Sequence, residues 1–195
     1  MIYSITLIWL TGVIFAVSHS LLATNKGKQI AYQVGLSSQA YRLGYVILAI
    51  LSTLLWLTFV HSLPDTALYS LDAPYAWALR GIQLLGVLLF WASLQPIDSG
   101  VFLGLKKFPD GIEPFIESGV YRYIRHPMYS SAMLIMFAMP QQSVNSINLY
   151  LVISLYFIIG ARFEENRLLL THPEYSDYRQ KVAAFIPRMQ RKACI

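Results

Sequence analysis

Residues 119–129 place two arginines, one histidine and three tyrosines directly before an apolar run. Pro127 stands where the first helical turn would begin, a position that tolerates its missing N–H. Cationic and polar groups at the mouth of a membrane-like helix are costly unless they bind something. A second polar pair, Glu164 and Glu165, follows almost forty residues later. We interpret the two clusters as halves of one ligand site.

The chemistry of the two clusters is complementary. Arg125 and His126, at a helix N-terminus, favour an anion, whereas Glu164 and Glu165 favour a cation. Adjacent helical residues do not share a face, so we expect one glutamate to face the ligand, with Glu165 preferred. S-Adenosylmethionine has a matching carboxylate, ammonium, sulfonium and adenine, but other zwitterions and lipid head groups match as well. Three tyrosines could stack on a flat ring or face a soft cation: Tyr121, Tyr123 and Tyr129.

The composition indicates a membrane protein. Of the 195 residues, 56% are hydrophobic and only 13% are charged, about half the charged share of a usual soluble domain. The net charge is +5, and the basic residues are spread between apolar runs. This distribution argues against nucleic-acid binding and favours loops that lie along anionic membrane lipids. No metal site and no obligate protein partner are predicted.

Five apolar runs predict an all-α bundle of transmembrane helices in one domain, residues 1–195. The fourth run has only about 13 residues, fewer than the roughly 20 that usually cross a bilayer, and forms a helical hairpin with the fifth. We divide the domain into a three-helix part, 1–97, and a cofactor-binding part, 98–188. A helical C-terminal tail is expected from Glu164 onward. The predicted spans are 2–23, 41–61, 75–94, 127–139 and 147–163.

Lysines and arginines predict the orientation. The loops 63–74 and 140–145 contain none, whereas the other connections and the tail are basic. The positive-inside rule then places the N-terminus outside and the C-terminal tail in the cytoplasm, in a bacterial inner membrane. The basic residues of these connections and of the tail are Lys26, Lys28, Arg42, Lys106, Lys107, Arg122, Arg125, Arg162, Arg167, Arg179, Lys181, Arg188, Arg191 and Lys192.

The order of motifs over roughly residues 80–188 resembles the isoprenylcysteine carboxyl methyltransferase family. Arg125-His126-Pro127 is followed, after one hairpin, by Glu164-Glu165, then by Pro173-Glu-Tyr-Ser-Asp-Tyr178 and Phe185-Ile-Pro187. The resemblance implies S-adenosylmethionine in a cytoplasm-facing pocket that the C-terminal segment covers. It implies a cofactor site lined by Arg125, His126, Tyr129, Glu164 and Glu165, with Tyr175 and Tyr178 in the covering tail. We add Tyr121 to the cofactor site for its ring, and we expect Arg125 and Glu165 to be catalytic as well.

The N-terminal half is similar to bacterial methanethiol S-methyltransferases, on His19-Ser-Leu-Leu-Ala23, Tyr41-Arg42 and residues 98–104. This likeness makes His19, Tyr41 and Arg42 candidate substrate residues. The structural alternatives are that His19 is a hydrogen-bonded histidine at the membrane interface and that Tyr41 and Arg42 anchor the second span. The expected function is methyl transfer to a small or lipophilic acceptor, a carboxylate or a thiol, without a choice between them.

A second function remains open at this point. His19-Ser20 together with Arg125-His126-Pro127-Met128 also resembles nitric-oxide-reduction accessory proteins and zeta-carotene isomerase. That resemblance implies a haem-binding membrane protein, although those proteins lack the Glu pair and the Tyr-x-x-Tyr tail. For Arg125 and His126, the bland alternative is a basic anchor that contacts lipid phosphates.

Overall fold

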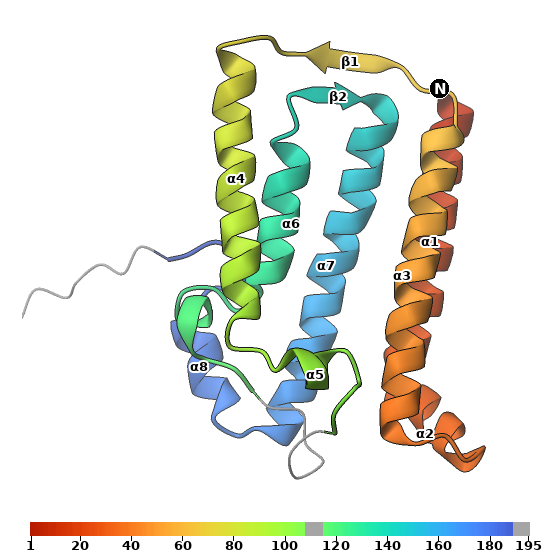
Figure 1. The fold of residues 1–195 in the computed structure, drawn as a ribbon, viewed down its shortest axis with the longest axis vertical. Coiled ribbons are helices and arrows are strands. Elements are labelled where there is room, and N and C mark those ends of the chain that lie inside the picture. Colours follow the sequence, from red (N-terminus) through yellow and green to blue (C-terminus); the bar gives the residue numbers. More distant parts are fainter. Residues whose placement is uncertain (108–114, 189–195) are drawn as a thin grey trace, which may run out of the picture.

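The computed structural model describes residues 1–107 and 115–188 as an almost entirely helical bundle (Figure 1). Arg191, Lys192 and Cys194 lie outside the described residues. An apolar but shorter helix, α6, spans Pro127–Phe137. Four helices are long and apolar enough to cross a membrane: α1 (Ile2–Ala23), α3 (Ser38–Ser62), α4 (Tyr75–Leu94) and α7 (Val144–Thr171).

These five helices run alternately between the two ends of the bundle (Figure 1). The end that holds the N-terminus carries both strands, β1 (Ala67–Ser70) and β2 (Gln141–Ser143). The opposite end carries the short helices: α2 (Asn25–Gln33), α5 (Ser99–Phe102), the 3-10 helix η2 (Gly119–Arg122) and α8 (Tyr175–Lys181). The predicted hairpin of the last two apolar runs is confirmed as α6 and α7, which β2 connects.

The apolar runs predict helix ends well only where polar residues stop the helix. α1 and α4 have the predicted bounds, and α3 begins three residues early because Ser37 accepts a hydrogen bond from the Ala40 N–H as an N-cap. α7 continues to Thr171, so the tail predicted to start at Glu164 is wrong. Hydropathy measures the apolar stretch, whereas the helix extends beyond it through polar residues.

The strand pair is a feature that the all-α prediction missed. β1 and β2 pair antiparallel, with Ser70 opposite Gln141 and Ala67 opposite Ser143. The two loops without lysine or arginine therefore lie at the same end of the bundle, as their charge predicted. The pairing joins the α3–α4 connection to the α6–α7 connection.

Asp65 fastens this end of the structure. Its Oδ1 accepts hydrogen bonds from the Thr66 N–H at 2.7 Å and from the Asn145 N–H at 3.0 Å, in the first turn of α7. The Asn145 amide returns a hydrogen bond to the Pro64 carbonyl at 3.2 Å. Burial alone would raise the pKa of Asp65, but hydrogen bonds from Ser143, Asn145 and Thr66 outweigh it and hold that pKa below its usual value.

Asp65→Asn should lower the thermal stability of the protein in detergent at neutral pH. The loss should be about 0.5–1 kcal/mol, as for an exposed helix cap. Because the folded pKa is depressed, the carboxylate stabilises the fold fully above the unfolded pKa of about 3.9 and loses this effect as pH falls through the folded value. Melting temperatures at neutral and at acid pH check this, with Asp72→Asn in the same loop as control. Equal melting temperatures at neutral pH would contradict it.

Two glycines allow neighbouring helices to approach each other closely. A Cβ at Gly12 of α1 would lie 2.5 Å from Val152 of α7, and one at Gly86 of α4 would lie 2.7 Å from Ile135 of α6. Ile8, Trp56, Val60, Leu149 and Val152 form the buried core between α1, α3 and α7. Helix α7 is thus shared: it packs on α1 and α3 on one side and on α6 on the other.

Candidate active site

The C-terminal segment, residues 175–188, holds the Arg125-His126-Pro127 motif in place. The Arg125 N–H donates to the Ala183 carbonyl and the His126 N–H donates to the Ala184 carbonyl, both at 2.9 Å. Ser130, one turn into α6, donates from its hydroxyl to the Phe185 carbonyl at 2.7 Å. A chain segment that follows α8 therefore lies along the start of α6, and Pro127 occupies the first helical position as predicted.

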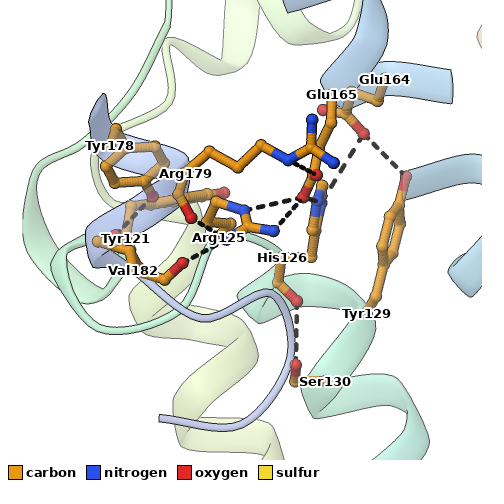
Figure 2. Close-up of polar contacts among 10 residues, drawn as sticks. All are labelled: Tyr121, Arg125, His126, Tyr129, Ser130, Glu164, Glu165, Tyr178, Arg179 and Val182. Carbon is orange, nitrogen blue, oxygen red and sulfur yellow. Dashed lines mark hydrogen bonds and ion pairs between the residues drawn. The ribbon is translucent and has the colours of Figure 1, made fainter. Parts of the chain in front are cut away.

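Arg125 and Glu165 form a buried ion pair across the α6–α7 hairpin (Figure 2). Nε and Nη2 of Arg125 lie 2.8 and 2.7 Å from Oε1 of Glu165. The side chains are 10% and 5% exposed. The prediction that the hairpin brings the two polar clusters together is confirmed. Desolvated charges of opposite sign stabilise a structure only when well paired, and removal of one partner is strongly destabilising.

The remaining donors of this cluster bind the C-terminal segment (Figure 2). Nη1 of Arg125 donates to the carbonyls of Arg179, at 3.0 Å, and of Val182. Nε of Arg179 lies 3.1 Å from Oε2 of Glu165. The guanidinium of Arg125 thus donates to Glu165 and to backbone oxygens of the C-terminal segment. In this arrangement, the charge of Arg125 is matched by the protein itself.

His126 lies between the two glutamates. Its Nε2 is 3.0 Å from Oε1 of Glu165, and its Nδ1 is 4.0 Å from Oε2 of Glu164. The ring is buried and stacks on Tyr129 with centroids 5.5 Å apart and planes 8° from parallel. Both glutamates therefore lie beside His126, while the expectation that one of them faces the ligand stays a prediction. Long side chains from adjacent positions of α7 reach one histidine from two sides.

Glu164 and Tyr129 form the open part of the cluster. The Tyr129 hydroxyl donates to Oε2 of Glu164 at 3.4 Å, and the Glu164 side chain is 40% exposed, against 5% for Glu165. Tyr129 also stacks on Phe157 with centroids 4.6 Å apart. A partly exposed carboxylate beside a stack of aromatic rings can bind an ammonium group together with a planar ligand.

The predicted tail tyrosines are part of the same assembly. Tyr175 and Tyr178 are buried on α8, and the Tyr178 hydroxyl donates to the Tyr121 carbonyl at 2.6 Å. Phe115 packs edge-on against both α8 rings. Burial raises the pKa of Tyr121 and of Tyr175 to about 12, so both hydroxyls are neutral at physiological pH. Their packing supports the C-terminal segment over the motif.

The three candidate substrate residues lie apart from this cluster. The Tyr41 hydroxyl donates to the Leu22 carbonyl, and Nε of Arg42 donates to the Phe102 carbonyl at 3.1 Å. These contacts tie the start of α3 to the end of α1 and to α5. His19 instead hydrogen-bonds through Nε2 to the Tyr45 hydroxyl at 2.6 Å. A substrate role for these three residues stays a prediction.

Sequence reasoning missed several members of the assembly. Arg179 was counted only as a basic tail residue, although it pairs with Glu165. Its position one residue after Tyr178 and close to the Phe-Ile-Pro motif is a signal that could have found it. Two aromatic neighbours had no local signature: Phe115 and Phe157.

The haem-binding alternative finds no support in the placement of the histidines. His126 is buried against Glu165 and stacked on Tyr129, whereas His19 is bonded to Tyr45 on another helix.

A comparison with family models matches residues 78–173 to phospholipid methyltransferases. The matched region contains both Arg125-His126-Pro127 and the Glu164-Glu165 pair. This match confirms the resemblance predicted from the sequence: the protein is a membrane methyltransferase. The methyltransferase function is favoured over the haem-binding alternative.

Curated relatives agree with this class. The chain is 28% identical over 184 residues to methanethiol S-methyltransferase 2 of Bradyrhizobium diazoefficiens, covering 90% of this chain and 70% of the relative. Methanethiol S-methyltransferase 1 of the same organism is 28% identical, over 89% of this chain and 64% of the relative. The methanethiol S-methyltransferase of Pseudomonas deceptionensis is 26% identical, over 91% of this chain and 71% of the relative. No solved structure matches the chain significantly.

Proposed function

We propose that the protein transfers a methyl group from S-adenosylmethionine to a small thiol. The observation that carries the proposal is the cluster in which Arg125, His126 and Glu165 meet beneath the C-terminal segment. The relatives described above, which are named for methyl transfer to methanethiol, favour a thiol over a carboxylate as acceptor. The proposed acceptor class is therefore narrower than the sequence motifs alone allowed.

The residues present fit this cofactor with a division of labour. Glu164, partly exposed beside Tyr129, is suited to bind the ammonium group, and His126 and Tyr129 offer stacked rings. Arg125 and Glu165 neutralise each other, so we assign them to fastening the C-terminal segment and aligning His126. Tyr121, Tyr175 and Tyr178 complete the cover through their packing at α8.

The main contribution of the protein to catalysis is positioning. When bound, S-adenosylmethionine supplies an electrophilic methyl group on a sulfonium. Holding a thiol in line with that group contributes up to about 7–11 kcal/mol, because two reactants no longer have to meet and orient. The side chains of Arg125, His126 and Glu165 are at most 10% exposed, so this wall of the cluster excludes water.

The proposed topology has five crossings of a bacterial inner membrane. α6 is short, yet it connects the same two ends of the bundle as the four longer helices (Figure 1). The strand end lacks lysine and arginine in both loops, and the opposite end is basic. The positive-inside rule therefore favours an outside N-terminus and a site and C-terminal tail in the cytoplasm.

The test uses the full chain purified in detergent. Calorimetry should detect binding of S-adenosylhomocysteine, and labelled methyl groups should pass from S-adenosylmethionine to methanethiol. A small carboxylic acid and a small amine, offered at equal concentration, should accept far less label. Absence of S-adenosylhomocysteine binding would overturn the cofactor, whereas binding with transfer only to the acid or amine would overturn the thiol.

A further inference from the structure

His19, Tyr45 and Tyr156 form a polar cluster among apolar helices, apart from the ion pair of the active site. Nε2 of His19 and the Tyr45 hydroxyl are 2.6 Å apart, and the two rings are in contact with centroids at 4.9 Å. Tyr156 of α7 meets His19 edge-on at 5.9 Å. Ionisable groups within membrane helices are rare because of their desolvation cost, and where present they often have a function.

This cluster faces the proposed cofactor residues along one side of α7. Tyr156, Gly160 and Glu164 are four residues apart, so they follow one another on the same helix face over about 12 Å. Tyr129, which contacts Glu164, stacks on Phe157 of α7, and the Phe157 and Tyr156 ring centroids are 6.2 Å apart. A continuous row of aromatic contacts therefore joins His19 and Tyr45 to Tyr129.

Gly160 keeps the middle of this face open. A Cβ added there would meet no atom within 4 Å, unlike Gly12 and Gly86, whose added Cβ atoms would strike neighbouring helices. Gly160 is therefore not required for helix contact. Its missing side chain leaves open space on the face of α7 that carries Tyr156 one turn before it and Glu164 one turn after it.

We propose that this space receives the acceptor and that Tyr45 and His19 together remove its proton. The proposal rests on the proposed function and adds the groups that activate the thiol. It assigns a small aliphatic thiol, because the open space at Gly160 corresponds to one missing side chain and the ring of Tyr156 lies one turn away on the same face of α7. A purely structural role, a hydrogen bond that ties α1 to α3, is the alternative that the experiment must separate.

The proton transfer balances as a relay. In the tautomer with the proton on Nδ1, the Tyr45 hydroxyl donates to Nε2 of His19. The thiol S–H bond breaks as its proton passes to the Tyr45 oxygen, while the Tyr45 proton passes to Nε2 and gives an imidazolium. The thiolate sulfur then bonds to the donor methyl carbon as the carbon–sulfur bond to S-adenosylhomocysteine breaks. The imidazolium returns its proton to water.

The test compares two thiols of similar size but different acidity, ethanethiol and 2,2,2-trifluoroethanethiol. His19→Ala and Tyr45→Phe should each lower kcat/KM for ethanethiol about 10²–10⁴-fold, the usual range for a lost acid–base group. For the fluorinated thiol, which ionises far more readily, the loss should be about tenfold or less, because ionisation no longer needs the dyad. His61→Ala, on the same helix as Tyr45 but at the strand end, is the matched control.

Equal losses with both thiols would overturn the relay and leave the dyad structural. S-Adenosylhomocysteine should bind to His19→Ala with wild-type affinity, and a loss of that binding would also overturn an acceptor-side role. If wild-type protein methylates neither thiol, the proposed function itself has failed, a result visible before any variant is compared.

A labelling experiment tests the space without turnover. Gly160→Cys in a Cys194→Ser background should react with a small alkyl methanethiosulfonate, and the thioether product ethyl methyl sulfide should slow that reaction several-fold. Gly44→Cys, whose position is also open but lies on α3, should react at a rate that the thioether does not change. A Gly160→Cys thiol that the thioether does not protect would overturn the acceptor space.

Discussion

Arg125→Met is expected to abolish binding of S-adenosylhomocysteine and to release the C-terminal segment. The guanidinium of Arg125 pairs with Glu165 and donates to the carbonyls of Arg179 and Val182, so its loss removes all three contacts. Removing one partner of a buried ion pair costs about 3–5 kcal/mol, since the other charge stays buried and uncompensated. Calorimetry measures the binding, and limited trypsin digestion at Arg179 and Lys181 reports the release.

Two companion variants make this result specific. Arg122→Met removes an exposed arginine of η2, three residues before Arg125. This change should alter neither the trypsin digestion nor the binding of S-adenosylhomocysteine. Arg125→Met combined with Glu165→Met replaces the ion pair by apolar side chains and should recover much of the lost stability, because no buried charge remains unpaired. Binding should stay lost in the double variant. Unchanged trypsin digestion of Arg125→Met would show that the segment is held by other contacts.

Glu164→Gln is expected to weaken S-adenosylhomocysteine binding about 10–150-fold while the protein keeps its melting temperature. A charge-assisted hydrogen bond contributes about 1.5–3 kcal/mol, and we assign that interaction to the carboxylate of Glu164 and the ammonium of the ligand. The Glu164 side chain is 40% exposed, so its carboxylate stays largely solvated and its loss should cost little stability. Calorimetry and thermal denaturation in the same detergent measure both quantities.

The neighbouring position provides the contrast. Glu165→Gln should lower the melting temperature strongly, because Arg125, His126 and Arg179 all converge on that carboxylate. If Glu164→Gln and Glu165→Gln lose stability equally, the division between a ligand-facing and a structural glutamate is wrong. If Glu164→Gln binds normally, the ammonium must be held elsewhere.

Sequence patterns predicted the long helices and the meeting of the two polar clusters for physical reasons that act locally. A run of apolar residues must be helical in a bilayer, and the hairpin must return Glu165 to the end where Arg125 begins α6. Proline at position 127 marked that start, and the structure places it at the first helical residue. The charge-free loops were likewise predicted to share one end.

The contacts within the site could not be predicted in the same way. Arg125 was expected to face an anionic ligand, yet it binds Glu165 and carbonyls at positions 179 and 182. The partner of an arginine depends on which distant segment folds against it. The sequence around Arg125 does not indicate that the C-terminal segment does so. The His19–Tyr45 contact depends equally on the relative rotation of α1 and α3.

The β1–β2 pairing also constrains the order in which the protein is made. β1 precedes α4, whereas its partner β2 and the α7 amide that Asp65 binds lie about 80 positions later in the chain. A ribosome that has completed α3 and α4 has therefore supplied only one side of the sheet and of the Asp65 cap. Both contacts close only when the α6–α7 hairpin has been inserted. The same insertion brings Glu165 to Arg125, so the last hairpin to enter the membrane completes both ends of the molecule.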